Sequence, residues 1–393
     1  MLLGNPIESR PMGAAFEPSD RFIAGRDLPP GTLGWHVDCA PNPMDLRPAV
    51  ETILRALDET RAKGTDGKPL MVLFGEVHSV PAYCHLLPFV ANRLHARGED
   101  FVVAQERPFN LWAEATAWGM EPSVPEDLLR QPSYLYDETG RGAVLSALCC
   151  VQIGMAPVST HNELAFFQDK GLKVVFNDVA RDRFLLEIDL ENPVVARAMQ
   201  AQPRRNHLHC DGRNSTAPEG IAIRNAVMAD LAVDFARRHK VPFILQQTGL
   251  THLFGNETDR RACAYADSLH AMATHRGMEV LAVLPTNHHY KCGLNLLPSG
   301  AQRALKDTVV IDGLAEDEFG HEYKDPAMEK AHLCEMLTAS GNEIPFYDVG
   351  ANLEEWRGRA REEAKNILEK YDERQAPRTP RGQKVEKPLA FGP

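Results

Sequence analysis

Short apolar runs recur along this chain and alternate with segments of helical pattern. The runs lie at residues 71–75, 101–105, 173–176, 242–245, 280–284 and 308–311. Each has the length of a buried strand, and the segments between them, such as 45–63 and 219–239, carry apolar residues at helical spacing. Strands that alternate with helices form βαβ units. The sequence therefore predicts an α/β fold, with a mostly parallel central sheet flanked by helices.

Composition divides the chain into four predicted parts. Residues 1–43 are rich in Pro and Gly and lack periodicity, so we expect an N-terminal arm there. Residues 44–315 hold the apolar runs and are expected to form the catalytic-type domain. Within it, residues 107–170 are interpreted as a helical and loop insertion that could act as a lid. The remainder is predicted as a helical extension at 316–374 and a flexible, Pro-rich tail at 375–393.

Residues with chemical functions stand where several of these strands are expected to end. They are Glu76 and His78 after the first run, Glu106 after the second, Asn177 and Asp178 after the third, and His252 after the fourth. The carboxyl ends of parallel strands lie on one edge of a sheet, where ligands bind. We therefore expect two histidines and two or three carboxylates to converge, the parts needed for proton transfer or metal binding.

These motifs follow an order that resembles a known superfamily. The order is Gly75-Glu76-Val77-His78, then Glu106, then Arg224-Asn225-Ala226-Val227-Met228-Ala229 on a helix, then Gly249-Leu250-Thr251-His252. It is similar to the G-E-x-H, Glu, R-[D/N]-x-x-M-A and G-x-x-H pattern of the erythromycin esterases, the haem-binding ChaN-like proteins, and the TraB and Tiki proteins. The resemblance covers roughly residues 70–285, and the loops at 107–170 and 200–218 have no counterpart in the pattern.

The resemblance implies a hydrolase that acts on an ester or amide bond of a small molecule or peptide. In an esterase-like mechanism, His78 or His252 is the general base, and Glu76 and Glu106 orient it or position the water. Arg224 would stabilise oxyanion charge or bind an acidic group of the substrate. In a Tiki-like mechanism, the residues Glu76, His78, Glu106 and His252 hold a divalent metal (Mn, Co or Zn) that activates water. The alternatives are a ChaN-like haem- or iron-binding protein and a non-catalytic relative.

Structural roles are open for the same residues. Glu76 and His78 could cap the following helix, and Glu106 could form a surface ion pair. Arg224 could serve only in a salt bridge, and His252 could be an ordinary loop histidine.

Two other histidine groups compete as sites. His207-Leu208-His209-Cys210-Asp211 resembles the H-x-H-x-D metal motif of metallo-β-lactamases, but Gly212 stands where that motif has another histidine. A solvated loop is therefore the favoured interpretation there. His288 and His289 follow the fifth run and could line the same edge of the sheet.

Several functional classes lack support. The chain contains no G-x-S-x-G, G-x-x-x-x-G-K-[ST], G-x-G-x-x-G or H-E-x-x-H motif. Its net charge of -11 disfavours binding to nucleic acid. We find no signal-peptide pattern, no apolar stretch long enough to span a membrane, and eight scattered cysteines without C-x-x-C. We therefore expect a cytoplasmic protein with reduced thiols, and the sequence leaves its oligomeric state open.

Overall fold

A seven-stranded sheet forms the centre of the molecule, and all its strand pairs are parallel. The computed structural model describes residues 31–64, 67–77, 80–108, 157–179, 188, 190, 192–200, 214–255, 263–286, 299–315 and 326–347. The strands are β1 (Trp35–Asp38), β2 (Leu70–Glu76), β3 (Phe101–Pro108), β4 (Lys173–Asp178), β5 (Phe243–Gly249), β6 (Glu279–Pro285) and β7 (Thr308–Asp312). The predicted α/β class and its six strands are confirmed, and β1 is a further strand inside the predicted N-terminal arm.

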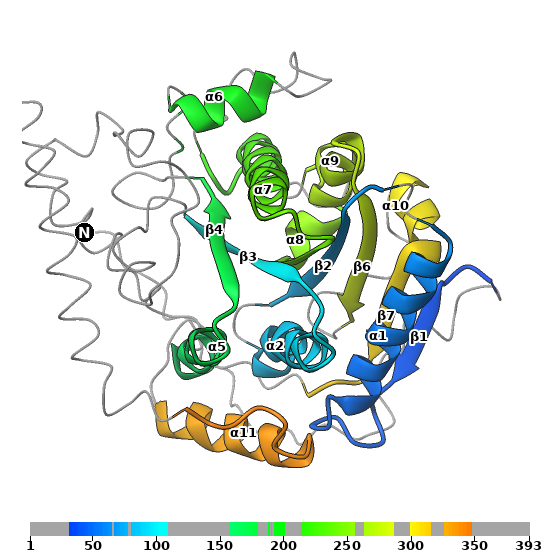
Figure 1. Cartoon of the computed structure of the whole chain (residues 1–393), viewed down its shortest axis with the longest axis vertical. Coiled ribbons are helices and arrows are strands. Elements are labelled where there is room, and N and C mark those ends of the chain that lie inside the picture. Colours follow the sequence, from blue (N-terminus) through cyan, green and yellow to red (C-terminus); the bar gives the residue numbers. More distant parts are fainter. Residues whose placement is uncertain are drawn as a thin grey trace, which may run out of the picture.

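The strand order across the sheet is β1-β7-β6-β2-β5-β3-β4 (Figure 1). The chain therefore starts at one edge, passes to the centre with β2, and builds outward in both directions. Residues 70–74 of β2 pair with β6 on one side, and the whole of β2 pairs with β5 on the other. Each strand at the centre is buried along nearly its whole length, which explains why these strands are continuous apolar runs in the sequence.

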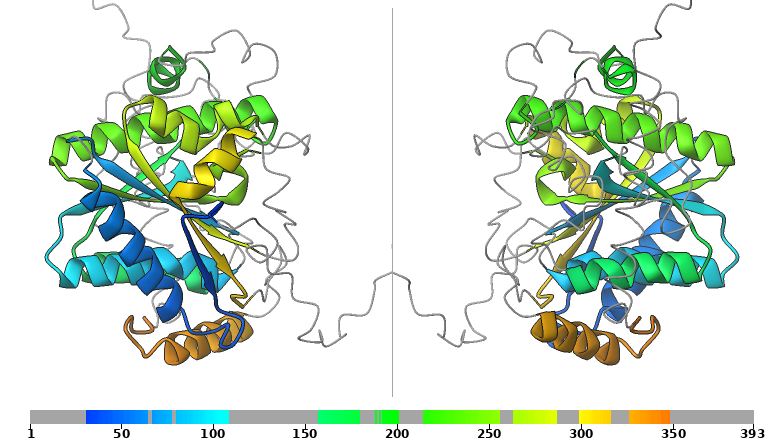
Figure 2. Two further views of the ribbon diagram at one scale, coloured as in Figure 1. Left: turned by 90° about the vertical axis from the view of Figure 1, so that its right-hand side faces the viewer. Right: turned by 90° about the vertical axis from the view of Figure 1, so that its left-hand side faces the viewer.

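Helices cover both faces of the sheet (Figure 2). They are α1 (Arg47–Ala62), α2 (Pro81–Ala96), α5 (Pro157–Asp169), α6 (Pro193–Gln200), α7 (Pro218–His239), α8 (Leu250–Leu253), α9 (Leu269–His275), α10 (Ser299–Ala304) and α11 (Pro326–Ala339), with 3-10 turns at Tyr265–Asp267 and Leu305–Asp307. Prolines at the first turn of α1, α2 and α7 favour helix starts, because their missing N–H groups would be unpaired there.

Two apolar clusters fill the space between the sheet and these helices. One cluster contains residues of α1, α2, α5 and α11, and the other contains residues of α6, α7, α9 and α10. Alternate residues of each central strand enter alternate clusters, as the two-residue period of a strand requires. We call the two sides the α2 face and the α7 face of the sheet.

The centre of the sheet is a topological switch point. The chain leaves β2 toward α2 on one face, and it leaves the adjacent β5 toward α8 and α9 on the other face. Such a divergence opens a crevice at the carboxyl ends of the two strands, and this is where open α/β sheets bind ligands. Any functional site of the fold is therefore expected beside Glu76 and Gly249, which are register partners at these ends.

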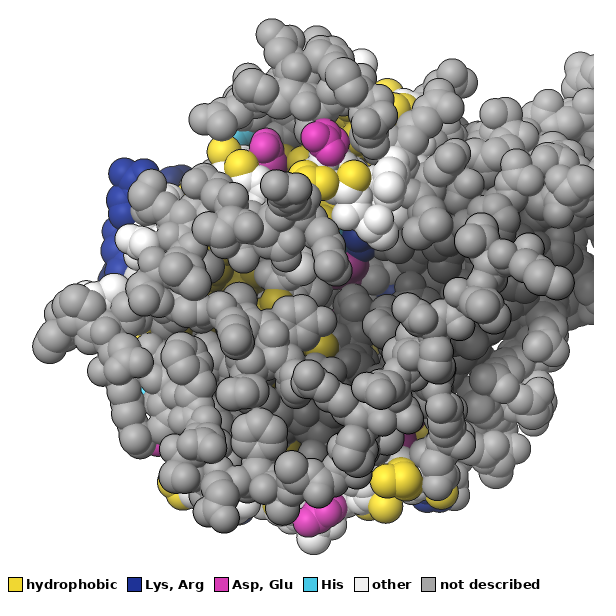
Figure 3. Space-filling model, turned by 180° about the vertical axis from the view of Figure 1, so that it is seen from behind, with side chains coloured by type: hydrophobic (Ala, Val, Ile, Leu, Met, Phe, Trp, Pro, Cys, Tyr) yellow, Lys and Arg dark blue, Asp and Glu magenta, His cyan; other side chains and the backbone are white. Residues whose placement is uncertain are grey.

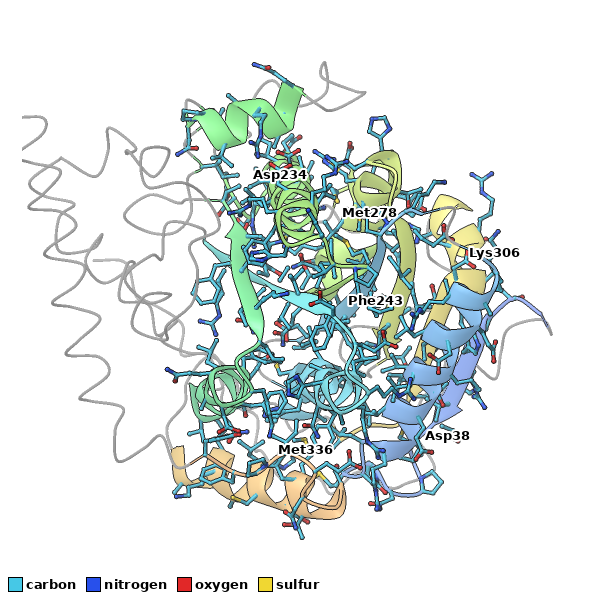
Figure 4. All side chains as sticks on the ribbon, viewed as in Figure 1. Asp38, Asp234, Phe243, Met278, Lys306 and Met336 are labelled. Carbon is cyan, nitrogen blue, oxygen red and sulfur yellow. The ribbon has the colours of Figure 1, made fainter. Side chains whose placement is uncertain are left out.

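Helix α11 fixes the position of α5 on the α2 face. The Glu329 carboxylate of α11 accepts hydrogen bonds from the N–H groups of Val158 and Ser159, at 3.2 and 2.8 Å. These N–H groups belong to the first turn of α5 and have no partner within the helix. Met336 also lies on the side of α11 that faces the apolar cluster, where it is fully buried (Figure 4).

The outer surface of the described ranges is ordinary for a folded domain. Met328 is the one large hydrophobic side chain described as exposed, and on the face seen in Figure 3 the coloured hydrophobic side chains are visible only in small groups. Across those same ranges, every helix is too short or too polar to cross a membrane.

Candidate functional site

The Glu106 carboxylate lies at the centre of a buried polar group on the α7 face. Its Oε2 atom accepts hydrogen bonds from Thr248 Oγ1 at 3.1 Å and from the Gly249 N–H at 2.6 Å. Its Oε1 atom accepts one from Arg224 Nη2 and lies 3.2 Å from His252 Nε2. The carboxylate thus joins the end of β5 to α7 and α8, beside the switch point.

Arg224 of α7 connects two carboxylates. Its Nε donates to Asp178 Oδ1 at 3.0 Å, and its Nη2 donates to Asp178 Oδ2 at 2.9 Å as well as to Glu106. All three side chains are buried. Burial alone would lower the pKa of Arg224, but the carboxylates of Asp178 and Glu106 raise it above its ordinary value. The guanidinium is therefore a permanent cation that balances two buried negative charges.

His252 of α8 has both ring nitrogens engaged by neighbouring groups. Its Nδ1 lies 2.6 Å from Asn225 Oδ1, and Asn225 Nδ2 donates to the Asp267 carbonyl oxygen at 2.8 Å. Because the Asn225 amide nitrogen is committed to a carbonyl, its oxygen must accept from His252, which assigns the hydrogen to Nδ1. Nε2 then carries the lone pair and faces Glu106.

Burial determines the charge of the His252 ring. It lowers the pKa of His252 below the ordinary value, while the nearby Glu106 carboxylate acts in the opposite direction. The imidazole is therefore neutral at neutral pH. A neutral ring with a lone pair on Nε2 has the form required of a general base.

Gly75 allows α8 to approach the sheet closely. A Cβ atom at this position would lie 2.6 Å from a Leu250 methyl carbon, 3.2 Å from one of Leu253 and 3.3 Å from the Val283 carbonyl oxygen. A side chain on residue 75 would force the Leu250 side chain of α8 to move, and His252 is carried on the same helix. Close packing of α8 against β2 therefore favours glycine at position 75, the first residue of the G-E-x-H motif.

Glu76 lies on the opposite face of the sheet from Glu106. Its Oε2 atom accepts a hydrogen bond from Gln247 Nε2, which also donates to the Cys84 carbonyl oxygen at 3.2 Å. Gln247 in turn accepts from Gln105 Nε2 at 3.0 Å. Strand alternation explains the separation, because Gln105 and Glu106 are neighbours on β3 and must point to opposite faces.

The structure therefore brings together Glu106, Arg224 and His252 among the predicted site residues. It places Glu76 at the same edge of the sheet but on the α2 face. His78, the H-x-H-x-D segment at 207–211 and the His288-His289 pair lie outside the described residues.

Two residues of the group were not among the predicted site residues. Asp178 was visible only as a polar residue at a strand end, and Asn225 only as part of the motif around Arg224. The signal that could have found Asn225 is its position next to Arg224 in the predicted motif.

The described members of the predicted metal set do not fit a divalent cation. Within the described ranges, no group of three or more His, Cys, Asp or Glu side chains could hold a metal ion. The Glu106 oxygen nearest His252 already accepts from the Arg224 cation, which would repel a metal.

Metal analysis of the purified protein tests this point. We expect much less than one equivalent of Mn, Co, Zn or Fe, and no change in metal content when His252 is replaced by alanine. Elemental analysis by mass spectrometry of both proteins is the measurement. Near-stoichiometric metal that is lost in the variant would instead place His252 in a metal site.

Comparison of the chain with family models, with curated proteins and with solved structures finds no match in any of the three.

Proposed function

We propose that this chain is a hydrolase that activates water with His252 and Glu106 to cleave an ester or amide bond. The observation that carries the proposal is the pairing of His252 Nε2 with Glu106 Oε1 at 3.2 Å, beside the switch point of the sheet. Both atoms are hydrogen-bond acceptors in the assigned protonation state. At this separation the two atoms are in direct contact, so the reacting water must lie beside the pair, where Nε2 can accept its hydrogen, and not between them.

The chemistry follows from the two acceptors. His252 Nε2 takes a proton from the water as the oxygen attacks the carbonyl carbon of the substrate. The protonated ring then returns this proton to the leaving alcohol or amine as the C–O or C–N bond breaks. Asn225 holds the Nδ1–H group, so the lone pair of the ring stays directed at the water and the ring stabilises the added proton. The arrangement of a base and a residue that orients it recurs in hydrolases of unrelated folds.

Arg224 serves this mechanism as a positioning residue. Its Nε and Nη2 groups are committed to Asp178 and Glu106. The guanidinium therefore keeps Glu106 ionised and fixed in place, a role that suits this geometry better than binding the substrate. Asp178 balances the remaining positive charge and anchors the guanidinium to the end of β4.

A substrate screen tests the proposal. The full-length protein is assayed against p-nitrophenyl esters of increasing acyl length and against amino-acid p-nitroanilides, beside the Glu106→Gln variant. We expect turnover on at least one class, and a fall in kcat/KM of about 10²-fold in the variant, because the amide lacks the charge that orients water and base.

A matched surface variant controls for the removal of a carboxylate. Glu99 precedes the start of β3, at the end of that strand opposite to Glu106, and forms an ion pair with Arg61 at 2.8 Å; Glu99→Gln should leave kcat/KM unchanged. Equal turnover in the wild type and Glu106→Gln would overturn the assignment. Turnover lost equally in both variants would also contradict it, since the effect would then not belong to the site.

A further inference from the structure

A second buried polar group lies on the α2 face, and the proposed mechanism does not use it. We call it the Glu163 group; its members are Glu76 on β2, Cys84 on α2, Gln105 on β3, Glu163 on α5 and Gln247 on β5. Glu163 is 3% exposed and Gln105 is 2% exposed. A carboxyl group so deeply buried is uncommon and needs a physical account.

The Glu163 group has more hydrogen-bond acceptors than donors. The amide nitrogen of Gln105 donates to Gln247, and that of Gln247 donates to Glu76 and to the Cys84 carbonyl. Two buried acceptor atoms, Glu163 Oε1 and Gln105 Oε1, have no hydrogen-bond partner within the described part of the chain. Unpaired buried acceptors are costly, so the group lacks at least one hydrogen.

The charges around Glu163 also favour an added proton. Burial raises the pKa of Glu163 well above its ordinary range, and the Glu76 carboxylate raises it further. Arg107 and the amides of Gln105 and Gln247 act in the opposite direction, and their effect is the smaller one.

The titratable groups of α2 bring no positive charge to the Glu163 group. Burial lowers the pKa of His85 to about 4, so its imidazole is neutral at neutral pH. Burial also raises the pKa of the Cys84 thiol, which therefore keeps its hydrogen. Cys84 and His85 of α2 thus supply neither a thiolate nor a histidine cation next to the two carboxyl groups.

We propose that Glu163 is a neutral carboxylic acid at neutral pH and that it positions Glu76 through Gln105 and Gln247. As a neutral acid, Glu163 contributes an O–H donor to a group that is rich in acceptors. As an ionised carboxylate, it would compete with Glu76 for the amide hydrogens of Gln105 and Gln247. The proton on Glu163 therefore leaves the Gln247 amide to Glu76, which is held at the same edge of the sheet as the proposed catalytic pair but on the opposite face.

The protonation is tested by the pH dependence of stability in Glu163→Gln, a variant that copies the shape of the neutral acid. An unfolded chain ionises Glu163 near its ordinary pKa, whereas the folded chain keeps the proton. Above that pKa, folding of the wild type therefore takes up a proton, so the wild type becomes less stable as the pH rises. The equilibrium constant for folding of the wild type should fall tenfold per pH unit relative to that of Glu163→Gln, until Glu163 ionises in the folded protein. Urea unfolding of both full-length proteins at pH 5, 6, 7 and 8 is the measurement.

Surface carboxylates provide the matched control. Glu343 pairs with Arg93 at the surface, so Glu343→Gln should show no stability gain that grows with pH. A Glu163→Gln variant that is less stable than the wild type by a constant factor from pH 6 to 8 would overturn the proposal, because that result requires an ionised, paired carboxylate. A carbonyl stretching band of a protonated carboxyl group in the infrared spectrum, present in the wild type and absent in Glu163→Gln, supports it independently.

The positioning role rests on the proposed function, and its test separates the two. With a substrate from the screen, the wild type should lose kcat/KM at alkaline pH as Glu163 ionises, and Glu163→Gln should keep its activity there. An alkaline loss that persists unchanged in the variant would refute the positioning role even if hydrolysis is real. If no hydrolysis is found, the stability and infrared results still decide whether Glu163 is neutral.

Discussion

Replacing Arg224 with methionine is expected to lower the free energy of unfolding by about 3–5 kcal/mol. The substitution keeps an apolar stem of similar length but removes the only cation that the described structure places on both Asp178 and Glu106. Two carboxylates would then be buried without a counter-charge, which is among the most costly single changes a folded protein can undergo. Urea unfolding at neutral pH measures the loss from the midpoint and slope.

The pH dependence and a surface control sharpen this expectation. At acid pH the stability deficit of Arg224→Met should shrink, because Asp178 and Glu106 can take up protons and no longer need the cation. Arg197→Met removes an arginine that pairs with Asp230 and Asp234 at the surface, and it should cost less than about 1 kcal/mol. A deficit of that small size in Arg224→Met itself would show that the buried network does not depend on Arg224.

Replacing His252 with alanine is expected to lower kcat/KM by about 10³-fold or more. The variant loses the lone pair that accepts the proton from water, while Glu106 keeps its bonds to Thr248, Gly249 and Arg224. The fold should therefore survive, which circular dichroism and a melting curve can check. His275→Ala is the matched control, because that histidine is exposed at the end of α9.

The pH profile identifies the base more directly than the loss of rate. Because burial lowers the pKa of His252, the wild-type kcat/KM should fall only as the pH drops below the ordinary histidine value of about 6.5. The acid limb should vanish from the residual rate of His252→Ala. If the residual rate of His252→Ala falls at the same pH as the wild-type rate, another group causes that fall. This result would contradict the role of His252.

The architecture was largely readable from the sequence, and the reason is burial. Central strands of a parallel sheet are enclosed on both faces, so they appear as uninterrupted apolar runs, and the six predicted runs are confirmed. β1 escaped prediction because its four residues, WHVD, include a charged and a half-exposed side chain. Among the described strands it pairs only with β7, and the side chains of His36 and Asp312, which are in contact across the two strands, are 276 residues apart. No local pattern reports such a contact.

The site was predictable as a location but not as a set of contacts. Strand ends identified Glu76, Glu106 and His252, since parallel strands share a carboxyl edge. The division of Glu76 and Glu106 between opposite faces depends on the register of β2, β5 and β3, which is fixed by pairing and not by the sequence of any one strand. Glu163 was hidden for a different reason: a charged residue in a helical segment gives no sign that it will be buried.

The pairing of β1 with β7 determines when the sheet can be completed during synthesis of the chain. Strand β1 leaves the ribosome well before its partner β7, since the contacting side chains of His36 and Asp312 are 276 residues apart. At about 5–20 residues per second, β1 would wait roughly 14–55 s for β7. The central strands β2, β3, β4 and β5 can associate in the meantime, so the nascent protein would assemble its proposed catalytic edge before its first strand has a place in the sheet.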